Sequence, residues 1–482
     1  MKRSTAFLSC AALALSACVG PNFHRPAPPR TDRYTAEALP EETASAEGSS
    51  GGAQKFLLEQ EVPRNWWLLF GSPELNDLVA EALRANPDVL SAQAALRQAL
   101  ENAAAQRGSY FPAVQGSFDA SRNLNATGVL APNLASGEPL YNLFTPQVTV
   151  SYVPDIFGGN RRQVESLAAQ AEASRYTLDA TYLTLTANVV TSAIQAAGLR
   201  AQIAGTAKVI SFERESLAVL RSSLGLGAIA EVDVYAQEAA LAQLEATLPP
   251  LQKQLQQTDD QLAVLTGRLP QDFKPSTLEL NDLTLPRDLP LDVPSRLVER
   301  RPDVRAAEAQ LHAATADVGV AVANMLPQFT ITGNLGSTAT AMSDLFKPGT
   351  GFWSIGATAT QTLFAGGTLL HRKRAADAAL DQAGAAYKSA VLTAFQNVAD
   401  ALHALDADAD ALNAASRAEI AAGKTLAVAR HELELGSVSY LALLIAEQSY
   451  EQALITLIQA RASRFTDTAA LFQALGGAIA PL

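Results

Sequence analysis

The chain has 482 residues, a formal net charge of −12 at pH 7 and only 6% aromatic residues. The length would suit three ordinary domains, and the abundant alanine favours long helices that pack closely through small side chains. No basic stripe is present that could neutralise phosphates, so the composition gives no support to nucleic-acid binding.

Residues 1–17 have the pattern of a bacterial lipoprotein signal peptide. A positively charged start precedes an apolar run from Ala6 to Leu15, which is too short to span a bilayer, and then Ser16-Ala17-Cys18. We expect cleavage before Cys18 and acylation of that cysteine, for example with palmitate. An ordinary secretory signal with a chance cysteine is the alternative. Val19 follows in place of the aspartate of an inner-membrane retention signal, which favours the outer membrane.

The segment 18–64 is predicted to be an acylated N-terminal tether. From Ala27 to about Gln60 it is rich in Pro, Ala, Ser, Glu and Gly and has no apolar period. It is therefore interpreted as a tether or a strap over the surface. Regular structure is expected to begin near Asn65-Trp66-Trp67.

A helix is expected to follow, with Ser72 as its N-cap and Pro73 in the first helical position. The helical pattern continues to about Arg107. A break is possible near Asn86-Pro87, because proline disfavours a helical conformation of the residue before it.

Four segments alternate between apolar and small polar residues, which predicts four strands with one apolar face each. The loops between partners, 123–143 and 337–351, are rich in Gly, Asn, Pro and Ser. The predicted strands are Ala113 to Arg122, Gln147 to Val153, Phe329 to Leu335 and Trp353 to Thr360.

Two Ala-rich stretches without proline predict helices of unusual length, from Arg161 to about Ser223 and from Thr368 to about Leu435. Each would be roughly 95–100 Å long, which suits a coiled coil or a tube better than a globular core. Each ends at a Gly-containing turn, after which a shorter helix returns. In the first return helix, Pro249-Pro250 should kink or split the helix, and Thr266-Gly267 should close it.

The chain is predicted to be an internal duplication. Asn86-Pro87-Asp88-Val89 and Arg301-Pro302-Asp303-Val304 each open an Ala-rich helix that is followed by two strands and a long helix. We assign the first repeat to 65–267, a Pro-rich connector to 268–293 and the second repeat to 294–482.

Four strands are too few for a closed barrel, since small barrels need about eight. Only helices and closed barrels satisfy every backbone polar group in a bilayer, so several copies must share one barrel, and three copies would give twelve strands. Tyr152 and Trp353 suit the interfacial aromatic belt. A soluble sandwich is the alternative. The expected fold is mainly α, with a trimeric 12-stranded β-barrel continued by a long α-helical barrel.

Several separated motifs resemble the outer membrane factor family, the TolC-like exit ducts of tripartite efflux pumps, and its lipoprotein branch in particular. The motifs are Cys18–Pro26, Asn65-Trp66-Trp67 through Phe70, Pro73-Glu74-Leu75-Asn76, Asn86-Pro87-Asp88 and Leu289–Leu311. The resemblance implies a passive homotrimeric duct in the outer membrane lipid. It also implies a periplasmic adaptor (membrane fusion) protein and an inner-membrane proton-driven transporter as partners. A protein-secretion duct and a non-transporting periplasmic coiled-coil scaffold lipoprotein remain alternatives.

The resemblance also implies an aperture pinched at the two hairpin tips, Leu224–Asp233 and Leu433–Leu441, often with an acidic ring near the second. That ring's position here reads Gly436 to Tyr440 and lacks the acid. Glu432, Glu434, Glu231 and Asp233 could substitute for it. Solvation of helix ends is the alternative for all four, with Glu231 and Asp233 simply favouring a helix N-terminus. Arg430 could pair with a carboxylate across the tip or be an ordinary exposed side chain. The tip candidates are Glu231, Asp233, Arg430, Glu432, Glu434 and Ser439.

An acidic cluster on the second long helix contains Asp400, Asp406, Asp408 and Asp410. Asp400, Asp406 and Asp410 are candidates for the lumen of the duct, and a solvated outer face is the alternative. The five histidines lack ligand spacing, and no phosphate-binding loop is present. The sequence therefore predicts no enzyme, no cofactor and no metal, and energy would have to come from a partner.

Overall fold

The computed structural model describes residues 19–29, 31–38, 40–47, 51–124 and 139–477. The expected signal peptide 1–17 and Cys18 lie outside them. Two compact units are present. One joins the chain up to Pro26 with Leu96–Ser174 and Ala307–Tyr387, and the other joins Ala27–Ala95, Arg175–Ala306 and Lys388–Leu482.

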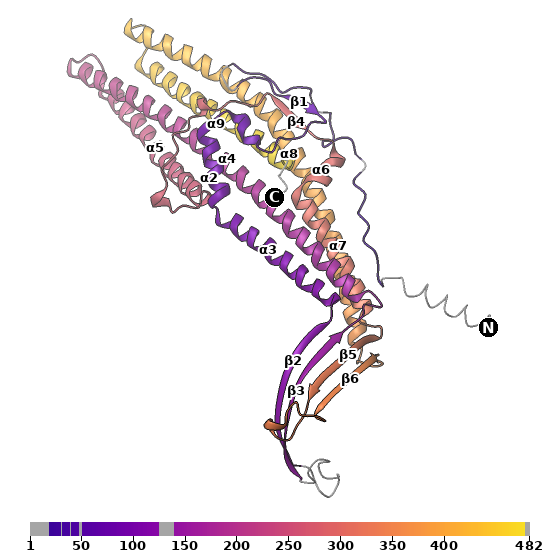
Figure 1. The fold of residues 1–482 in the computed structure, drawn as a ribbon. Helices are drawn as coiled ribbons and strands as arrows, with labels where there is room; N and C mark the ends of the chain where they lie inside the picture. The colour runs from indigo at the N-terminus through magenta and orange to yellow at the C-terminus, as the bar shows by residue number, and fades with distance from the viewer. Residues whose placement is uncertain (1–18, 30, 39, 48–50, 125–138, 478–482) are drawn as a thin grey trace. The chain divides into compact units, whose positions relative to one another are not determined.

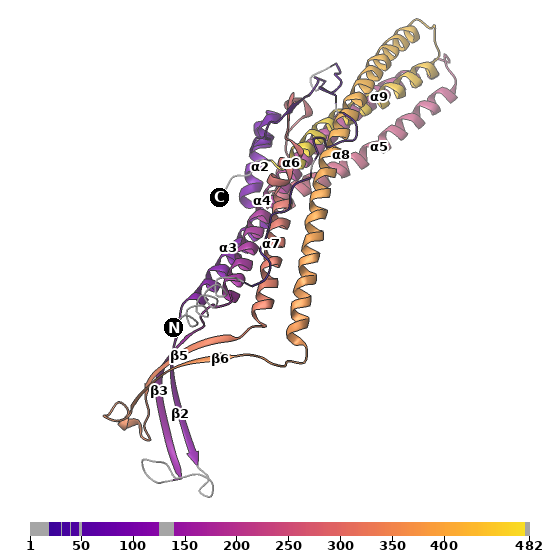
Figure 2. The same ribbon diagram turned by 90° about the vertical axis from the view of Figure 1, so that its right-hand side faces the viewer.

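The order of elements is the same in both halves of the chain, which confirms the predicted duplication (Figures 1 and 2). The long helices α4 and α8 have 67 residues each, and the return helices α5 and α9 have 35 each. The first half contains α2 Pro73–Ala85, α3 Pro87–Arg107, β2 Ala113–Leu124, β3 Leu140–Tyr152, α4 Gly159–Gly225 and α5 Glu231–Leu265. The second half contains α6 Pro294–Arg300, α7 Pro302–Ala323, β5 Gln328–Ser337, β6 Gly351–Thr360, α8 Thr368–Glu434 and α9 Tyr440–Ala474.

The predicted helix break near Asn86-Pro87 is confirmed, and so is the cap at Ser72. The Ser72 hydroxyl accepts a hydrogen bond from the Leu75 amide at 3.3 Å. Asn86 ends α2 and also caps α3, because its side-chain oxygen accepts from the amides of Asp88 and Val89. These side chains satisfy amides that have no partner within the helix.

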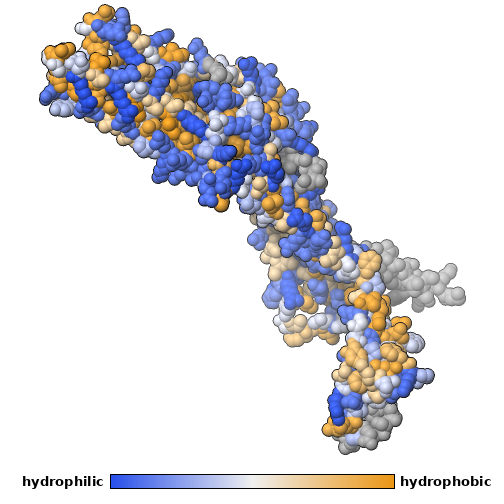
Figure 3. Space-filling view, turned by 60° about the vertical axis from the view of Figure 1, so that its left-hand side comes forward, coloured by the Kyte–Doolittle hydropathy of each residue, from blue (hydrophilic) through white to orange (hydrophobic). Residues whose placement is uncertain are grey.

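The four predicted strands form one antiparallel sheet in the order β2-β3-β5-β6 (Figure 1). The register places Val114 beside Val150, Val148 beside Leu335 and Leu335 beside Trp353, so the apolar residues of all four strands share one face. Hydrophobic residues gather over this strand region in the space-filling view (Figure 3). The period-two prediction is therefore confirmed across the whole sheet.

The opposite face of the sheet is polar and partly hydrogen-bonded. The Thr149 hydroxyl donates to Asn334 Oδ1 at 2.8 Å, and Asn334 Nδ2 donates to Ser354 Oγ at 3.3 Å. β3 begins at Leu140, earlier than expected. Pro146 does not end the strand: it stays paired with Phe118 of β2, and its missing amide interrupts the β3–β5 ladder only between the Phe144–Ala339 bridge and the Gln147–Gly336 pair.

The expectation that regular structure begins at Asn65 was wrong. Two short strands, β1 Lys55–Leu58 and β4 Asp288–Leu291, pair in parallel and join the predicted tether to the predicted connector. Thr43 and Gln54 are buried as well. Strands of four residues are too short to show a hydrophobic period in a segment rich in proline and glycine.

Pro249-Pro250 does not split α5, contrary to one form of the prediction. Both prolines are exposed, so solvent can satisfy the carbonyls that lose their helical donors. The predicted end at Thr266 is confirmed. Among the described residues, no helix combines the length and the apolar character that a membrane span requires.

Candidate functional site at the helical hairpins

α4–α5 and α8–α9 form two antiparallel hairpins, each of which ends at a tight turn (Figures 1 and 2). Gly227 and Gly436 adopt positive φ angles of 70° and 72°, a conformation that favours glycine. The Ala228 amide donates to the Ser223 carbonyl at 3.0 Å, and the Ser437 amide donates to the Glu432 carbonyl at 2.9 Å. These bonds satisfy carbonyls at the helix ends, so both turns are well defined.

The first-tip candidates lie at the N-terminus of α5. The Asp233 carboxylate accepts from the Ala230 amide at 3.3 Å and so caps the helix. Glu231 is the exposed first residue of α5. This placement supports the helix-terminus interpretation of both acids. Their role in a gate stays a prediction.

The second-tip candidates are not brought together into one cluster. The Glu432 main-chain carbonyl accepts from both the amide and the hydroxyl of Ser437. A Glu434 carboxylate oxygen lies 3.9 Å from His431 Nδ1, with both side chains exposed. Ser439 is exposed and makes no side-chain cap to α9.

Arg430 is half-buried and reaches into the interior of the helical unit. Its Nη2 donates to Glu447 Oε1 at 3.3 Å, and its guanidinium carbon lies 4.9 Å from the centre of the Phe212 ring. Of the two alternatives left open for Arg430, the structure shows pairing with a carboxylate, that of Glu447 on α9, and a role of Arg430 in a gate stays a prediction. This geometry combines a charge-assisted hydrogen bond with a cation–π contact.

Around Arg430 lies a buried polar cluster that the sequence did not single out. Glu213 of α4 and Glu447 of α9 are each 3% exposed, and Gln237 of α5 is fully buried. Gln237 Nε2 donates to both the side-chain Oε2 and the main-chain oxygen of Glu213. Burial, and then the nearby Glu213 carboxyl, raise the pKa of Glu447 to about 7, against the opposing effect of Arg430. The cluster therefore joins all four hairpin helices.

A signal for Glu447 was present in the sequence. Leu443, Leu444 and Glu447 lie three or four residues apart, so they share one face of α9, and all three are buried. A glutamate on the apolar face of a helix needs a buried partner.

The lumen candidates differ in their surroundings. Asp400 is exposed, accepts from Gln396 Nε2 at 3.3 Å and borders a cavity of about 470 Å³ together with Asp467. Asp406 is half-buried and Asp410 is exposed. Asp408 instead faces Asp467, and burial followed by that carboxyl raises its pKa to about 7. The four acids thus do not form one uniform surface, and a lumen role for them stays a prediction.

Arg464 of α9 is a second buried charge that the sequence did not reveal, with no exposed surface. It donates to the Thr43 hydroxyl and the Gly52 carbonyl at 2.9 Å each, and to Gln54 Oε1 at 3.3 Å. The predicted strap is therefore fixed to α9 by a network of buried hydrogen bonds.

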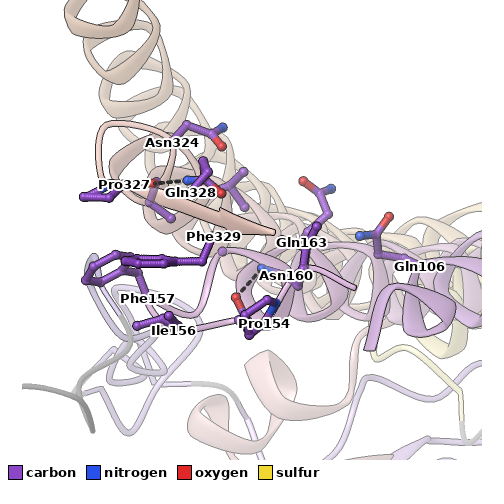
Figure 4. A pocket seen from close by; sticks show the side chains of 15 residues that line it. Gln106, Pro154, Ile156, Phe157, Asn160, Gln163, Asn324, Pro327, Gln328 and Phe329 are labelled. Carbon is purple, nitrogen blue, oxygen red and sulfur yellow. Dashed lines mark hydrogen bonds between the residues drawn. The ribbon is translucent and has the colours of Figure 1, made fainter. Parts of the chain in front are cut away.

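The turn from β3 into α4 forms a polar pocket of about 310 Å³ (Figure 4). Gly158 has a φ of 79°, and the Asp155 carboxylate accepts from the amides of Asn160 and Arg161 at 2.9 Å each. The rings of Phe157 and Phe329 lie side by side, with centres 6.4 Å apart. Asp155 therefore caps the N-terminus of α4.

Four strands with one exposed apolar face and two hairpins of very long helices define the class of outer-membrane channels. The sequence profile described as outer membrane efflux protein matches residues 78–268 and 293–477, so the chain belongs to that family.

Individual relatives agree with this assignment. The chain is 30% identical to the pyoverdine export outer membrane protein OpmQ of Pseudomonas putida, over 86% of this chain and 88% of that one. It is 28% identical to the outer membrane protein OprJ of Pseudomonas aeruginosa, over 97% and 94%. The solved structure of the outer-membrane channel OprN has a TM-score of 0.85 at 28% identity, over 96% of this chain and 99% of that chain.

The open state of the Neisseria gonorrhoeae MtrE outer membrane channel has a TM-score of 0.79 at 25% identity, over 96% of this chain and 98% of that chain. The chain is therefore an outer-membrane exit duct of an efflux system, and not an enzyme. The predicted family, fold class and function are confirmed.

Proposed function

We propose that three copies of the chain assemble into one passive duct. The carrying observation is the sheet, whose outer strands β2 and β6 each pair with one neighbour only among the described residues. β2 and β6 run antiparallel to each other, because three antiparallel pairings separate them. The β6 edge of one copy can therefore continue the ladder with the β2 edge of the next, and three copies close a 12-stranded barrel without an edge.

The apolar face of that barrel would contact outer-membrane lipid. Val114, Leu335, Trp353 and Ile355 are between 65% and 77% exposed in the single chain. Exposed side chains of this size, gathered on one face of the sheet, need an apolar environment. The polar ladder through Thr149, Asn334 and Ser354 would then face the water-filled interior.

Lipid anchoring at Cys18 is part of the proposal. The residues directly after it are bound to the rest of the chain. The Val19 amide donates to the Phe157 carbonyl at 3.3 Å. Phe23 stacks on His312 with ring centres 4.4 Å apart, and Arg25 pairs with Glu308 at 3.0 Å. Acyl chains on Cys18 would therefore be held close to the turn that leads into α4.

We further propose the partners that the family resemblance implies. A periplasmic adaptor would bind the hairpin tips, and an inner-membrane proton-driven transporter would supply small molecules to the duct. The candidates for the aperture are the tip residues Glu231, Asp233, Arg430, Glu432, Glu434 and Ser439, and those for the lumen are Asp400, Asp406 and Asp410. The tether 18–64, the repeats 65–267 and 294–482 and the connector 268–293 complete the proposed organisation.

The test is the oligomeric state and conductance of the full mature chain in detergent and planar bilayers. We expect a trimer that dissociates on heating before gel electrophoresis, and discrete channels in the bilayer. A stable monomer would overturn the shared barrel. Mass spectrometry of the membrane-extracted protein should find a lipid on Cys18, and the Cys18→Ser variant should lack it while still forming trimers.

A further inference from the structure

The buried cluster between the two hairpins contains a pair of carboxyls with too few donors. Glu213 and Glu447 line the same cavity, and each is 3% exposed. Gln237 donates to Glu213, and Arg430 donates to one oxygen of Glu447. The other oxygen, Glu447 Oε2, is buried and has no donor among the described residues. Two carboxylate acceptors that face each other need a proton between them.

If both carboxyls of the pair are ionised, they carry two negative charges against the one positive charge of the Arg430 guanidinium. Arg430 donates a hydrogen bond to the Glu447 carboxyl and supplies a positive charge to the pair. Gln237, the contact from α5, carries no charge. The other groups that face the cluster or border its cavity are Lys208 of α4, Glu419 and Lys424 of α8, and Tyr440, Tyr450, Glu451 and Arg461 of α9.

We propose that Glu213 and Glu447 share one proton and form a pH-sensitive latch between the α4–α5 hairpin and the α8–α9 hairpin. With the proton in place, one carboxyl donates to the other, and Arg430 balances the remaining negative charge. Loss of the proton leaves two buried carboxylates and one guanidinium, and the like charges repel each other across the α4–α9 contact.

The direction of the pH effect follows from the elevated pKa of Glu447. Burial and Glu213 raise that pKa from an ordinary 4.5 to about 7. A carboxyl with a raised pKa in the folded state stabilises the contact fully below its ordinary pKa. That stabilisation is lost as the pH rises through about 7. The latch would hold in a mildly acidic periplasm and loosen in an alkaline one. In the proposed duct, on which this consequence rests, the hairpins surround the aperture, so loosening would favour its opening.

Hydrogen exchange on the full-length protein in detergent tests the latch directly. Exchange in residues 440–458 is measured at about pH 6 and about pH 8.5, on either side of the raised pKa, and is corrected for the intrinsic pH dependence of amide exchange. We expect several-fold lower protection at the higher pH in the unmodified chain. Glu447→Gln should keep its protection at both values, because the amide donates to Glu213 without a titratable proton.

Two further variants make the result decisive. In Glu213→Gln the amide at position 213 donates to Glu447, so this variant should behave like Glu447→Gln. It replaces the first variant if that one does not fold. Glu245→Gln, in an exposed ion pair with Arg214, is the matched control and should respond to pH as the unmodified chain does. An equal loss of protection in the unmodified chain and both cluster variants would overturn the latch. Bilayer conductance measured in parallel reports on the duct separately, because exchange reads out the latch whether or not the protein conducts.

Discussion

The two hairpins have helices of equal length, but they differ in where they place their charges. Near its tip, α4–α5 joins its helices by two exposed ion pairs, Arg214–Glu245 and Arg221–Glu238, each 2.7 Å long, and the half-buried pair Arg200–Asp259 joins them further along. In α8–α9 the corresponding pair, Arg430–Glu447, has its carboxylate buried. The first hairpin also has the larger apolar core near its tip, with seven buried residues against four. The first hairpin is therefore largely self-sufficient, whereas the second depends on α4 to complete its polar interior.

Tyr440 shows how the two hairpins are connected. This first residue of α9 packs against the apolar cores of both hairpins. Burial, and then the carboxyls of Glu447 and Glu213, raise the pKa of its hydroxyl. A duplicated unit has thus become asymmetric, because the first hairpin supplies the larger apolar core and one buried carboxyl, Glu213, whereas the second supplies the buried charges Glu447 and Arg464.

The largest expected effect comes from the most buried charge of the second hairpin. Arg464→Ala leaves Thr43, Gln54 and the Gly52 carbonyl without their donor, which should cost about 3–5 kcal/mol of stability. The matched change in the first hairpin, Arg221→Ala, removes an exposed pair and should cost about 1 kcal/mol or less. Thermal unfolding of the two purified variants measures the difference. Equal shifts in melting temperature would contradict the contrast between buried and exposed charges.

Truncations in the apolar cores should cost the first hairpin more stability than the second. This is the opposite of the ranking expected when buried and exposed charges are removed. Leu244→Ala and Leu443→Ala each remove a buried side chain, at a cost of about 2–5 kcal/mol. Leu244 belongs to the larger core, where surrounding side chains can collapse less readily into the space, so its truncation should cost more. Local hydrogen exchange in each hairpin provides the measurement. A greater loss for Leu443→Ala would show that the second hairpin depends more on its apolar core than its size indicates.

A smaller effect is expected from the second carboxyl pair, Asp408 of α8 with Asp467 of α9. The pKa of Asp408 is raised to about 7 by burial and by Asp467, so its contribution to stability is present at acidic pH and is lost as the pH rises through about 7. Asp408→Asn should remove this dependence, which amounts to about 1–2 kcal/mol after allowance for solvent screening. Melting temperatures measured across this pH range test it. Asp410→Asn, at an exposed position of the same helix, is the control and should leave the slope unchanged.

The comparison also separates what the sequence reveals from what it hides. Long Ala-rich runs and period-two strands predicted α4, α8 and the sheet, because each pattern repeats over many residues. Arg464 was not identified, since a single charge on a long helix does not reveal which of its faces is buried. Glu447 was overlooked, although its spacing from Leu443 and Leu444 places it on the apolar face of α9. The pairing of β1 with β4 was missed because it joins two short segments that are far apart in the chain.

The smallest expected effect distinguishes a cap from a gate at the first tip. The Asp233 carboxylate accepts from the Ala230 amide, so Asp233→Ala should cost about 0.5–1 kcal/mol, whereas Asp233→Asn keeps an acceptor and should cost less. If Asp233 serves only as a cap, conductance in planar bilayers should be the same for Asp233→Asn and the unmodified chain. A gate formed by charge predicts the reverse, with altered conductance in Asp233→Asn and in the combined Glu231→Gln and Asp233→Asn variant, at unchanged stability. Since neither Glu231 nor Asp233 is buried, we expect the first outcome and place the responsive element in the Glu213–Glu447 pair between the two hairpins.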